Sequence, residues 1–460
     1  MSDVPALAVA ERPLLSTATI AQISMLGLAL LLPVLTWVQA AGCALLALLF
    51  SLFLLPRLDS GFGIRDSGFA EATLPITAPR ASIVVYSGSV LLLILFYRHS
   101  LHVAAAVWAI MALGDGLAGV AGRALDGPAL PWNRQKTWSG SCTFVLAGSL
   151  GAYALTRWVN SSLEPRQVLV ISAATALVGA AVESLPANVI RLDDNLTVPL
   201  VCGGFMFCAY LVERSALESN LPYLGRRILL AAVINLGLAI AAFALKTITR
   251  SGAVAGFILG MMVYLGWGWK SFLLLFAFFV LGSAATRLGY AKKAALGVAE
   301  GHGGARSWRA VVANLLAGAF FSILVITTHH EKAFLVALIA TFAEAAGDTV
   351  SSEVGQWLST RTYLITTFKR VRVGQNGGVS LAGSFAGLAA SAAVVALGFA
   401  LGLASLGGGV VALAAAIAGN FLDSLLGATL ERRRLATNGI VNFAGTSFAG
   451  AVALALMISS

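Results

Sequence analysis

Charged residues are scarce in this sequence: Asp, Glu, Lys and Arg make up 11% of its 460 residues, against about 25% in soluble domains. Hydrophobic residues make up 58%. Apolar runs of about 17 or more residues, the length that crosses the hydrocarbon core of a bilayer, recur along the whole chain. The composition excludes an ordinary soluble domain and indicates a polytopic integral membrane protein.

Cysteine is also rare, and two common signatures are missing. The four cysteines lie in apolar segments without a CxxC pair, so we expect neither a disulfide framework nor a zinc site. No GxxxxGK[ST] sequence is present, which excludes the P-loop template for nucleotide binding. The formal net charge of +10 is explained by basic cytoplasmic loops, and we expect no nucleic-acid partner.

The apolar runs predict an all-α protein with about fifteen transmembrane helices. With the N-terminus in the cytoplasm, most of the 30 lysines and arginines fall on the cytoplasmic side, as the positive-inside rule requires. We therefore expect an integral protein of a bacterial inner (plasma) membrane with cytoplasmic active-site loops. The predicted spans are 18–36, 40–56, 81–97, 101–120, 139–157, 167–184, 197–213, 227–245, 252–268, 272–287, 309–328, 333–348, 378–402, 408–423 and 443–458.

Short similarities between the two halves predict a parallel internal repeat. "GDGLAGVAGR" at 114–123 aligns with "GDTVSSEVGQ" at 347–356, and "ESL" at 183–185 corresponds to "DSL" at 423–425. In each half an aspartate is expected to end one span and a second carboxylate to end another. The polar stretch "ERSALESNLPYLGRR" (213–227) is the predicted linker. The expected domains are 1–222 and 223–460.

The first half collects residue types that bind metal ions and phosphate. Carboxylate oxygens suit Mg²⁺, which keeps substrate phosphates as further ligands. We expect Asp115, Glu183, Asp193 and Asp194 to form the metal site, with Asp115 and Glu183 as the catalytic carboxylates. Glycine lets a ligand approach the backbone, basic side chains neutralise phosphate, and helix N-termini bind anions. The predicted nucleotide- and phosphate-binding residues are Gly114, Gly116, Gly119, Arg123, Lys136, Ser139 and Asn195.

The second half contains the same types of residue. Glu344 and Asp348 share a helix face at spacing i, i+4, and together with Glu353 and Asp423 they form the predicted metal site, with Asp348 and Asp423 catalytic. The turn "NGGVS" (376–380) before a span is a predicted anion site. The predicted phosphate-binding residues here are Lys369, Asn376, Gly377, Gly378, Asn438 and Asn442. Lys292, Lys293 and Arg306 are expected to contact either phosphate or the membrane interface. Taken singly, such residues are more often caps, solvated loop residues or packing residues; the combination of acidic sites, a glycine-rich turn and a basic loop on one face favours a metal and phosphate site.

These motifs resemble two enzyme families. "GDGLAGVAGR…LPWNRQKTWSGS" with "VESLP…DDNLTVPL" is similar to the membrane-bound CTP-dependent lipid alcohol kinases, phytol kinase more closely than dolichol kinase, over roughly residues 20–215. "AEAAGDTVSSEVGQ", "LITTFKRVRVGQNGGVSLAG" and "GNFLDSLLGATLERR…VNFAGT" resemble a second family of integral membrane proteins, which includes plant phytyl-phosphate kinase, over roughly 227–460.

The resemblance implies a fusion of two successive kinases. The first half would phosphorylate an isoprenoid alcohol in the bilayer, such as phytol or geranylgeraniol, and the second half would convert the isoprenyl phosphate to the diphosphate. CTP as the phosphoryl donor is implied by the family alone. Two alternatives stay open: a transporter or flippase for a lipid or polyprenyl phosphate, whose polar site is expected near the bilayer midplane, and a kinase with one active half.

Overall fold

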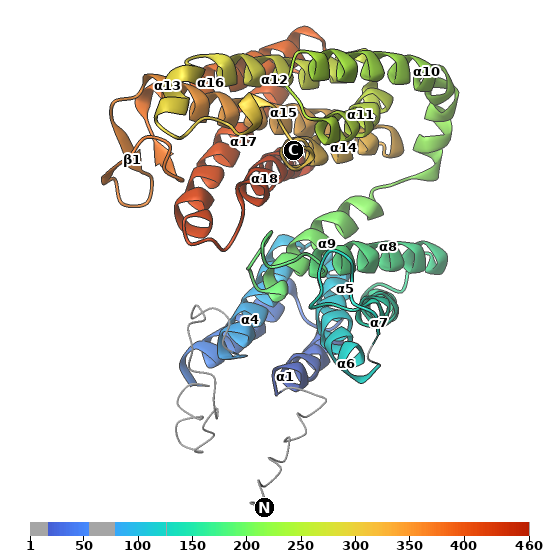
Figure 1. Ribbon diagram of the computed structural model, residues 1–460. Helices are drawn as coiled ribbons and strands as arrows, with labels where there is room; N and C mark the ends of the chain where they lie inside the picture. Colours follow the sequence, from blue (N-terminus) through green and yellow to red (C-terminus); the bar gives the residue numbers. More distant parts are fainter. Residues whose placement is uncertain (1–16, 55–78, 126, 460) are drawn as a thin grey trace, which may run out of the picture. The chain divides into compact units, whose positions relative to one another are not determined.

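The computed structural model describes residues 17–54, 79–125 and 127–459, and the chain forms two compact units (Figure 1). Unit 1 comprises Met1–Ala187 and Leu192–Tyr210, and unit 2 comprises Asn188–Arg191 and Leu211–Ser460. Both consist almost entirely of helices, which confirms the predicted class of all-α polytopic membrane protein.

Unit 1 places its helices in the order of the predicted spans. They are α1 (Thr17–Leu26), η1 (Gly27–Leu31), α2 (Trp37–Leu49), η2 (Phe50–Leu54), α4 (Pro79–Phe96), α5 (Leu101–Ala109), η3 (Ile110–Asp115), α6 (Gly116–Ala124), α7 (Trp138–Val159), α8 (Pro165–Glu183) and α9 (Asp194–Tyr210). The segments α5, η3 and α6 form one continuous helix, in which η3 is a π-helical turn that ends at Asp115.

Unit 2 contains the remaining helices and a small sheet. They are α10 (Arg214–Ala244), α11 (Arg250–Trp267), α12 (Trp269–Arg287), α13 (Tyr290–Ala295), η4 (His302–Gly304), α14 (Trp308–Thr327), α15 (Glu331–Leu358), β1 (Thr362–Leu364), β2 (Arg370–Val371), β3 (Gly378–Val379), α16 (Leu381–Ala400), α17 (Leu406–Leu426), η5 (Gly427–Glu431) and α18 (Asn438–Ser459). The strands pair antiparallel in the order β2-β1-β3, with Tyr363 opposite both Arg370 and Val379.

In each unit the most deeply buried of the candidate membrane helices carries the first predicted aspartate. The apolar window of Leu101–Ala124, with Asp115, is 72% buried, and that of Glu331–Leu358, with Asp348, is 89% buried. Glycine allows the close packing around α15, since a Cβ at Gly387 of α16 would lie 2.7 Å from the Gly347 carbonyl oxygen. Small residues at such contacts are typical of helix packing in membranes.

Every predicted span overlaps a helix in the described part of the chain, but the predicted number of spans is not confirmed. Among the described residues, eleven helices are long and apolar enough to cross a membrane. The predicted linker 213–227 is also helical, because it forms the first part of α10 and follows Glu213, the residue at the helix N-cap. The polar residues of this stretch do not interrupt the helix, since most of them have a moderate or good helix propensity.

Two predicted span ends do not coincide with helix ends. Asp115 and Asp348 do not end their helices: the first continues to Ala124 and the second to Leu358. Hydropathy falls at these aspartates, but the small and polar residues that follow remain helical because they pack against α7 and α16. The helix that carries Asp423 likewise continues through η5 to Glu431, whereas Glu183 does end α8.

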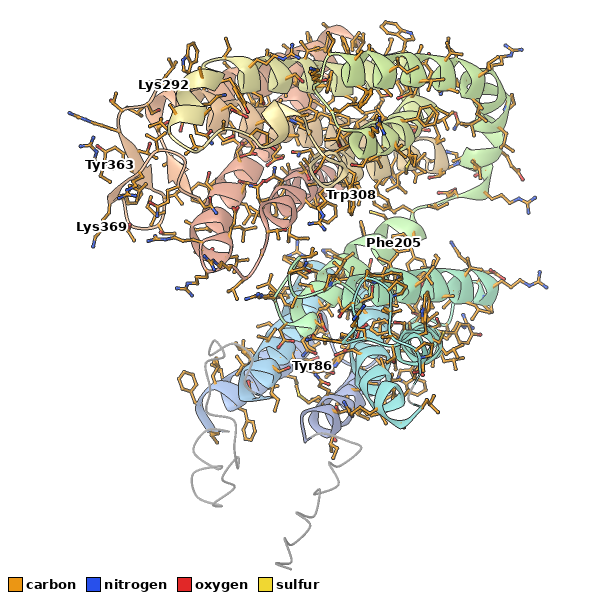
Figure 2. The ribbon with its side chains drawn as sticks, in the orientation of Figure 1. Tyr86, Phe205, Lys292, Trp308, Tyr363 and Lys369 are labelled. Carbon is orange, nitrogen blue, oxygen red and sulfur yellow. The ribbon has the colours of Figure 1, made fainter. Side chains whose placement is uncertain are left out.

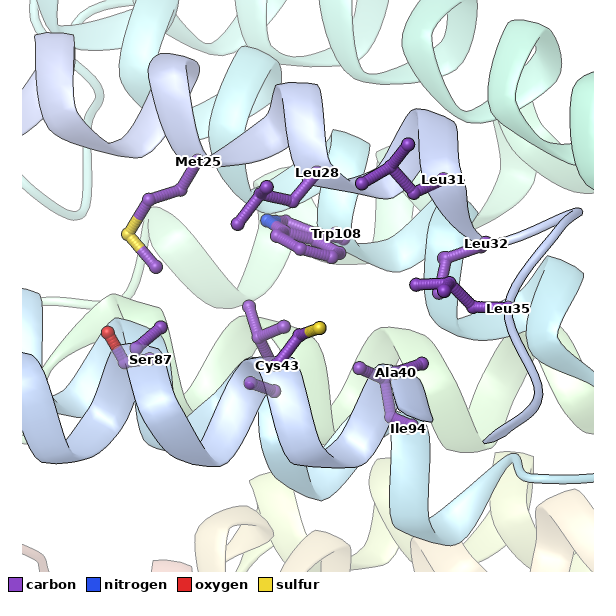
Figure 3. Close-up of a pocket in the computed structure, with 13 residues that line it drawn as sticks. Met25, Leu28, Leu31, Leu32, Leu35, Ala40, Cys43, Ser87, Ile94 and Trp108 are labelled. Carbon is purple, nitrogen blue, oxygen red and sulfur yellow. The ribbon is translucent and has the colours of Figure 1, made fainter. Parts of the chain in front are cut away.

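A small apolar pocket lies between the first helices of unit 1 (Figure 3). It holds about 40 Å³ and is lined by α1, η1, α2, α4 and α5, with the Trp108 ring among aliphatic side chains. The Trp108 Nε1 donates a hydrogen bond to the Tyr86 hydroxyl, which donates to the Gln22 carbonyl oxygen. These bonds tie α5, α4 and α1 together beside the acidic group described next.

Candidate active site

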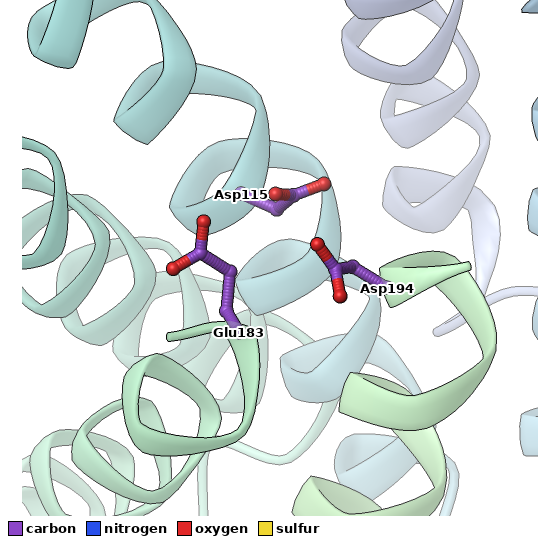
Figure 4. Close-up of side chains that lie close together, drawn as sticks. All are labelled: Asp115, Glu183 and Asp194. Atoms are coloured by element: carbon purple, nitrogen blue, oxygen red, sulfur yellow. The ribbon is translucent and has the colours of Figure 1, made fainter. Parts of the chain in front are cut away.

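Three carboxylates from three helices meet in unit 1 (Figure 4). Asp115 lies at the end of the π-helical turn, Glu183 is the last residue of α8, and Asp194 is the first residue of α9. One oxygen atom of each lies within 4.8 Å of the others. This separation is compatible with a shared cation, and π-helical turns inside α-helices occur frequently at functional sites.

The basic loop between α6 and α7 brings Lys136 to this acidic group. The Asn133 side-chain amide donates to the carbonyl oxygens of Ser184 and Leu185, and Trp132 Nε1 donates to the Ser184 hydroxyl at 3.2 Å. These bonds attach the loop to the end of α8. The Lys136 Nζ then contacts the Glu183 carboxylate and lies 3.3 Å from the Asp194 Oδ2.

The carboxylates keep Lys136 charged. Burial alone would lower the pKa of the Lys136 ammonium, but the carboxylates of Asp194 and Glu183 outweigh it and raise the pKa above the ordinary lysine value. A raised lysine pKa contributes stability that is complete below the ordinary value of about 10.4 and is lost only as pH rises through the folded-state value. Lys136 is therefore a fixed positive charge beside the acidic group at every physiological pH.

Lys136→Met is expected to destabilise unit 1 by about 1–3 kcal/mol, because it leaves the Glu183 and Asp194 carboxylates facing each other without their donor. Thermal unfolding of the purified protein in detergent would measure this loss. It should shrink at acidic pH, where protonation of the carboxylates removes their repulsion. Arg134→Met changes an exposed cation of the same loop and serves as the control. Equal loss in both variants would contradict the role of Lys136.

The other predicted residues of unit 1 lie around this group in different roles. The Asp193 Oδ1 accepts from the Asn195 backbone N–H and side-chain amide, so this carboxylate caps α9. The Asn195 side chain also donates to the Ser82 hydroxyl and accepts from Gln22 Nε2 at 3.0 Å, which leaves its amide fully hydrogen-bonded. The structure thus places Asn195 in a buried network that joins α1, α4 and α9.

The predicted glycines and the predicted basic residue of α6 also differ in their surroundings. A Cβ at Gly114 would lie 3.2 Å from the Phe144 ring, so this glycine permits packing against α7. Gly116 is buried as well, whereas Gly119 and Arg123 are exposed on α6. Ser139 is half-buried in the first turn of α7, with its hydroxyl 3.1 Å from that of Thr137, the N-cap residue.

Unit 2 contains a polar cavity of about 730 Å³. Its wall is formed by α14, α15, the loop around β3, α16, α17 and α18. Arg306 lines it, and so do seven of the predicted metal- and phosphate-binding residues: Asp348, Glu353, Asn376, Gly377, Gly378, Asn438 and Asn442. Lys369 does not, since it lies exposed in the turn between β1 and β2 (Figure 2).

Two further carboxylates lie behind Asp348 with unpaired oxygen atoms. Glu344 is 1% exposed, and neither of its carboxylate oxygens has a hydrogen-bond partner in the described part of the chain. The Asp423 Oδ2 is also unpaired there, and the carboxyl groups of Asp348 and Asp423 lie within hydrogen-bonding reach of each other. Buried carboxylates this close cannot all be ionised unless a cation neutralises them.

Two asparagines place further oxygen atoms at this cavity. The Oδ1 atoms of Asn314 and Asn442 are buried, and within the residues that the structure describes they accept no hydrogen bond. Both residues line the cavity, one from α14 and one from α18. Amide and carboxylate oxygens are the ligands that hard cations prefer, and unsatisfied buried acceptors are costly without such a partner. These oxygen atoms are therefore of the type that a divalent cation binds.

The "NGGVS" segment is shaped by a close backbone approach. Gly377 has φ +72°, and a Cβ there would collide with the backbone of Ala428 in the π-helical turn η5 that follows α17. The Ser380 side chain accepts a hydrogen bond from the Gly383 N–H at 3.2 Å and thereby caps α16. Backbone groups of this turn consequently line the cavity at a helix N-terminus, where an anion is favoured.

Glu353 is held by an ion pair. Its Oε2 lies 2.5 Å from Nζ of Lys293, which is fully buried, and its Oε1 accepts from the Thr286 hydroxyl. Lys293 Nζ also donates to the carbonyl oxygens of Ala285 and Thr286. The pair joins α13 and α12 to α15 at the cavity wall, so both predicted ligand atoms of Glu353 already have partners.

Lys293→Met is expected to destabilise unit 2 by about 3–5 kcal/mol, because it leaves the Glu353 carboxylate buried without its counter-charge. Adding Glu353→Gln should restore most of the loss, since the double variant buries no net charge. Thermal unfolding of the four proteins of this cycle would test it. Lys292→Met, which changes the exposed neighbour, is the control. A double variant as unstable as Lys293→Met would contradict the pairing.

Sequence reasoning missed residues whose role depends on the fold. Asn133 carries no signal in its loop beyond being polar. Asn314 did carry one, because an asparagine inside the apolar run "VVANLLAG" is unusual in a membrane helix. Arg306, in contrast, was among the predicted phosphate or interface contacts, and it lines the cavity with its guanidinium carbon 5.5 Å from the centre of the Phe278 ring.

The sequence of this chain is similar to those of known membrane proteins. The family model described as integral membrane protein DUF92 matches residues 233–456. An uncharacterized membrane protein of Synechocystis, sll0875, is 35% identical over 223 residues, which cover 48% of this chain and 86% of that protein. No solved structure matches.

Two plant proteins match this chain over a smaller fraction of their own length than the Synechocystis protein does. The chloroplastic protein VTE6 of Arabidopsis thaliana is 35% identical over 214 residues, 45% of this chain and 64% of that protein. The chloroplastic phytol kinase 1 of Arabidopsis thaliana is 34% identical over 107 residues, 22% of this chain and 34% of that protein. The chain therefore spans less than two thirds of either.

Proposed function

Starting from the membership of this chain in the DUF92 family of integral membrane proteins, we propose that it is a bifunctional lipid kinase. Unit 1 phosphorylates a long-chain isoprenoid alcohol, and unit 2 phosphorylates the resulting monophosphate. The observation that carries the proposal is the group of Asp115, Glu183 and Asp194, with ligand atoms within 4.8 Å of one another, beside the fixed charge of Lys136. The names of relatives such as phytol kinase 1 support the same chemistry.

In unit 1 the nucleophile is a hydroxyl group, so a proton acceptor is needed. The alcohol oxygen bonds to the γ-phosphorus of the nucleotide, the bond from that phosphorus to the β–γ bridging oxygen breaks, and the nucleoside diphosphate leaves. The hydroxyl proton passes to the Asp115 carboxylate, which has the Lys136 ammonium and two further carboxylates as neighbours. General-base catalysis of this kind contributes about 10²–10⁴-fold to a rate.

In unit 2 the nucleophile is a phosphate oxygen, which needs little deprotonation. Charge neutralisation and positioning dominate such a reaction. The backbone of Asn376–Gly378 and the side chains of Asn438, Asn442 and Arg306 line the cavity and would hold the two phosphate-bearing substrates. The Asp348 carboxyl lies on the same wall.

Mg²⁺ is the proposed cofactor of both sites. Asp115, Glu183 and Asp194 would hold it in unit 1, and Glu344, Asp348 and Asp423 in unit 2, where the unpaired buried oxygen atoms match its preference for oxygen ligands. When bound, the ion neutralises the charge of the polyphosphate. The donor is proposed to be CTP, on the resemblance of the motifs to CTP-dependent lipid kinases, and the nucleotide-binding loops are proposed to face the cytoplasm.

The kinase proposal depends on the loops beside the carboxylates more than on the position of the two aspartates along their helices. Asp115 and Asp348 lie within long helices, so their position does not separate a kinase from a transporter. The Lys136 loop and the Gly377 turn do, because they place a cation and backbone groups of an anion-binding turn beside the carboxylates. A transporter's site is expected at broken helices near the midplane instead.

An enzyme assay tests the proposal. The purified protein in nanodiscs would receive Mg²⁺, labelled CTP or ATP, and phytol, geranylgeraniol, farnesol or one of their monophosphates. Label is expected in the monophosphate and then in the diphosphate of at least one alcohol. No transfer to any acceptor, together with movement of a polyprenyl phosphate across vesicles that contain the protein, would favour the transporter and contradict the kinase.

A further inference from the structure

The cavity of unit 2 has an apolar flank that its phosphate chemistry does not use. Leu388 of α16 and Ile417 and Phe421 of α17 line the cavity and are also exposed on the surface of the unit, with exposed fractions of 43%, 47% and 60%. All three belong to helices long and apolar enough to cross a membrane. Part of the apolar surface of these three side chains is therefore not covered by the rest of the unit.

Helical spacing shows that this flank is a seam between two helices. On α16 the lining of the cavity includes Ser384 and Leu388, and on α17 it includes Ile417, Phe421 and Ser424. Residues spaced by three, four and seven lie on one face of a helix. Gly383, Gly387 and Ser391 lie on the side of α16 that packs against α15. Ser384 and Leu388 line the cavity at the edge of this contact.

The seam is polar at one end and apolar at the other. Ser380, where α16 begins, and Ser424, near the end of α17, lie beside the Gly377 turn and the carboxylates. Leu388 and Ile417 lie further along, at about 10–12 Å for seven or eight residues at 1.5 Å each. The two helices are antiparallel neighbours in sequence, so both stripes become apolar in the same direction.

We propose that this seam binds the isoprenoid chain of the monophosphate substrate, with the phosphate at the polar end and the chain passing between Leu388 and Ile417 into the bilayer. The inference rests on the proposed function of unit 2 and adds the subsite that selects the length of the chain. A prenyl chain is a flexible hydrocarbon anchored by one phosphate, and the seam offers contacts in that order: anion-binding backbone, hydroxyl groups, then aliphatic and aromatic side chains.

Chain-length dependence tests the subsite. Ile417→Trp fills the seam and should lower kcat/KM for geranylgeranyl monophosphate by about tenfold or more, because several methylene contacts are lost. The value for dimethylallyl monophosphate, which does not reach Ile417, should stay near that of the unaltered protein. Val410→Trp is the matched control: Val410 lies two turns earlier on the same face of α17, is 63% exposed and does not line the cavity. Leu388→Trp and Leu381→Trp form the equivalent pair on α16.

Photolabelling tests the subsite by binding alone, without a measurement of turnover. Farnesyl monophosphate with a diazirine near its distal end should label peptides of α16 and α17 in the unaltered protein, and Ile417→Trp should reduce that labelling. Labelling confined to other helices, or a loss of kcat/KM that is equal for short and long chains, would overturn the subsite while leaving the kinase in place. If no prenyl monophosphate is phosphorylated by the unaltered protein, it is the proposed function that fails.

Discussion

Asp115→Asn is expected to lower phosphorylation of the isoprenoid alcohol by about 10²-fold or more, because it removes the proposed proton acceptor and one cation ligand of unit 1. Phosphorylation of the monophosphate should persist, since Asp348 and its neighbours belong to unit 2. The substitution keeps the side-chain volume and removes only charge. Separate initial-rate assays with the alcohol and with its monophosphate would measure the two activities in one preparation.

Glu164→Gln is the matched control for this prediction. Glu164 caps the start of α8, at the opposite end of the helix from Glu183, and its carboxylate accepts from the Gln167 N–H at 2.6 Å. Glutamine keeps an acceptor there, so both activities should remain. Equal loss of both activities in a folded Asp115→Asn protein would show that the two reactions share one composite site.

Asp348→Asn is expected to have the opposite effect. The second phosphorylation should fall by about 10²-fold or more, and isoprenyl monophosphate should accumulate when alcohol and nucleotide are supplied. Asp348 lies on the wall of the unit 2 cavity and within reach of Asp423, so the substitution removes one carboxylate from the group that would neutralise the transferring phosphoryl charge. Chromatography of labelled products would resolve monophosphate from diphosphate.

Glu331→Gln controls for charge removal on the same helix. Glu331 begins α15, about 25 Å from Asp348 at 1.5 Å per residue, and its substitution should leave diphosphate formation unchanged. Two results for Asp348→Asn would count against the assignment. Diphosphate made at the unaltered rate would place the second site elsewhere, and a loss of monophosphate as well would make the two units interdependent.

The helices of this fold were predictable from composition, and their ends were not. Runs of apolar residues locate a membrane helix because burial in lipid requires them. They do not locate its last residue, since Gly116–Ala124 and Thr349–Leu358 are polar or small yet remain helical through packing on neighbouring helices. The depth of Asp115 and Asp348 within their helices was therefore hidden.

The candidate sites were predictable only as sets of residues. Sequence order placed Asp115, Glu183 and Asp194 in one set because each ends or begins a polar stretch next to a span. It did not show that Asn133 fixes the loop to Ser184 and so sets Lys136 between Glu183 and Asp194. The sequence also did not show the partner of Glu353. Its spacing from Asp348 predicts a cation ligand, and the structure adds an ion pair with Lys293, sixty residues earlier.

Complementation between two variants tests most directly whether the units are separate enzymes that act in order. Asp115→Asn and Asp348→Asn proteins would be reconstituted together in one membrane with isoprenoid alcohol, Mg²⁺ and labelled nucleotide. Independent sites predict that diphosphate forms although neither variant makes it alone, because monophosphate released by one protein diffuses in the bilayer to the other. A mixture that makes only monophosphate, while the Asp115→Asn protein phosphorylates added monophosphate, would contradict free exchange. A mixture in which neither product forms would contradict two independent sites altogether.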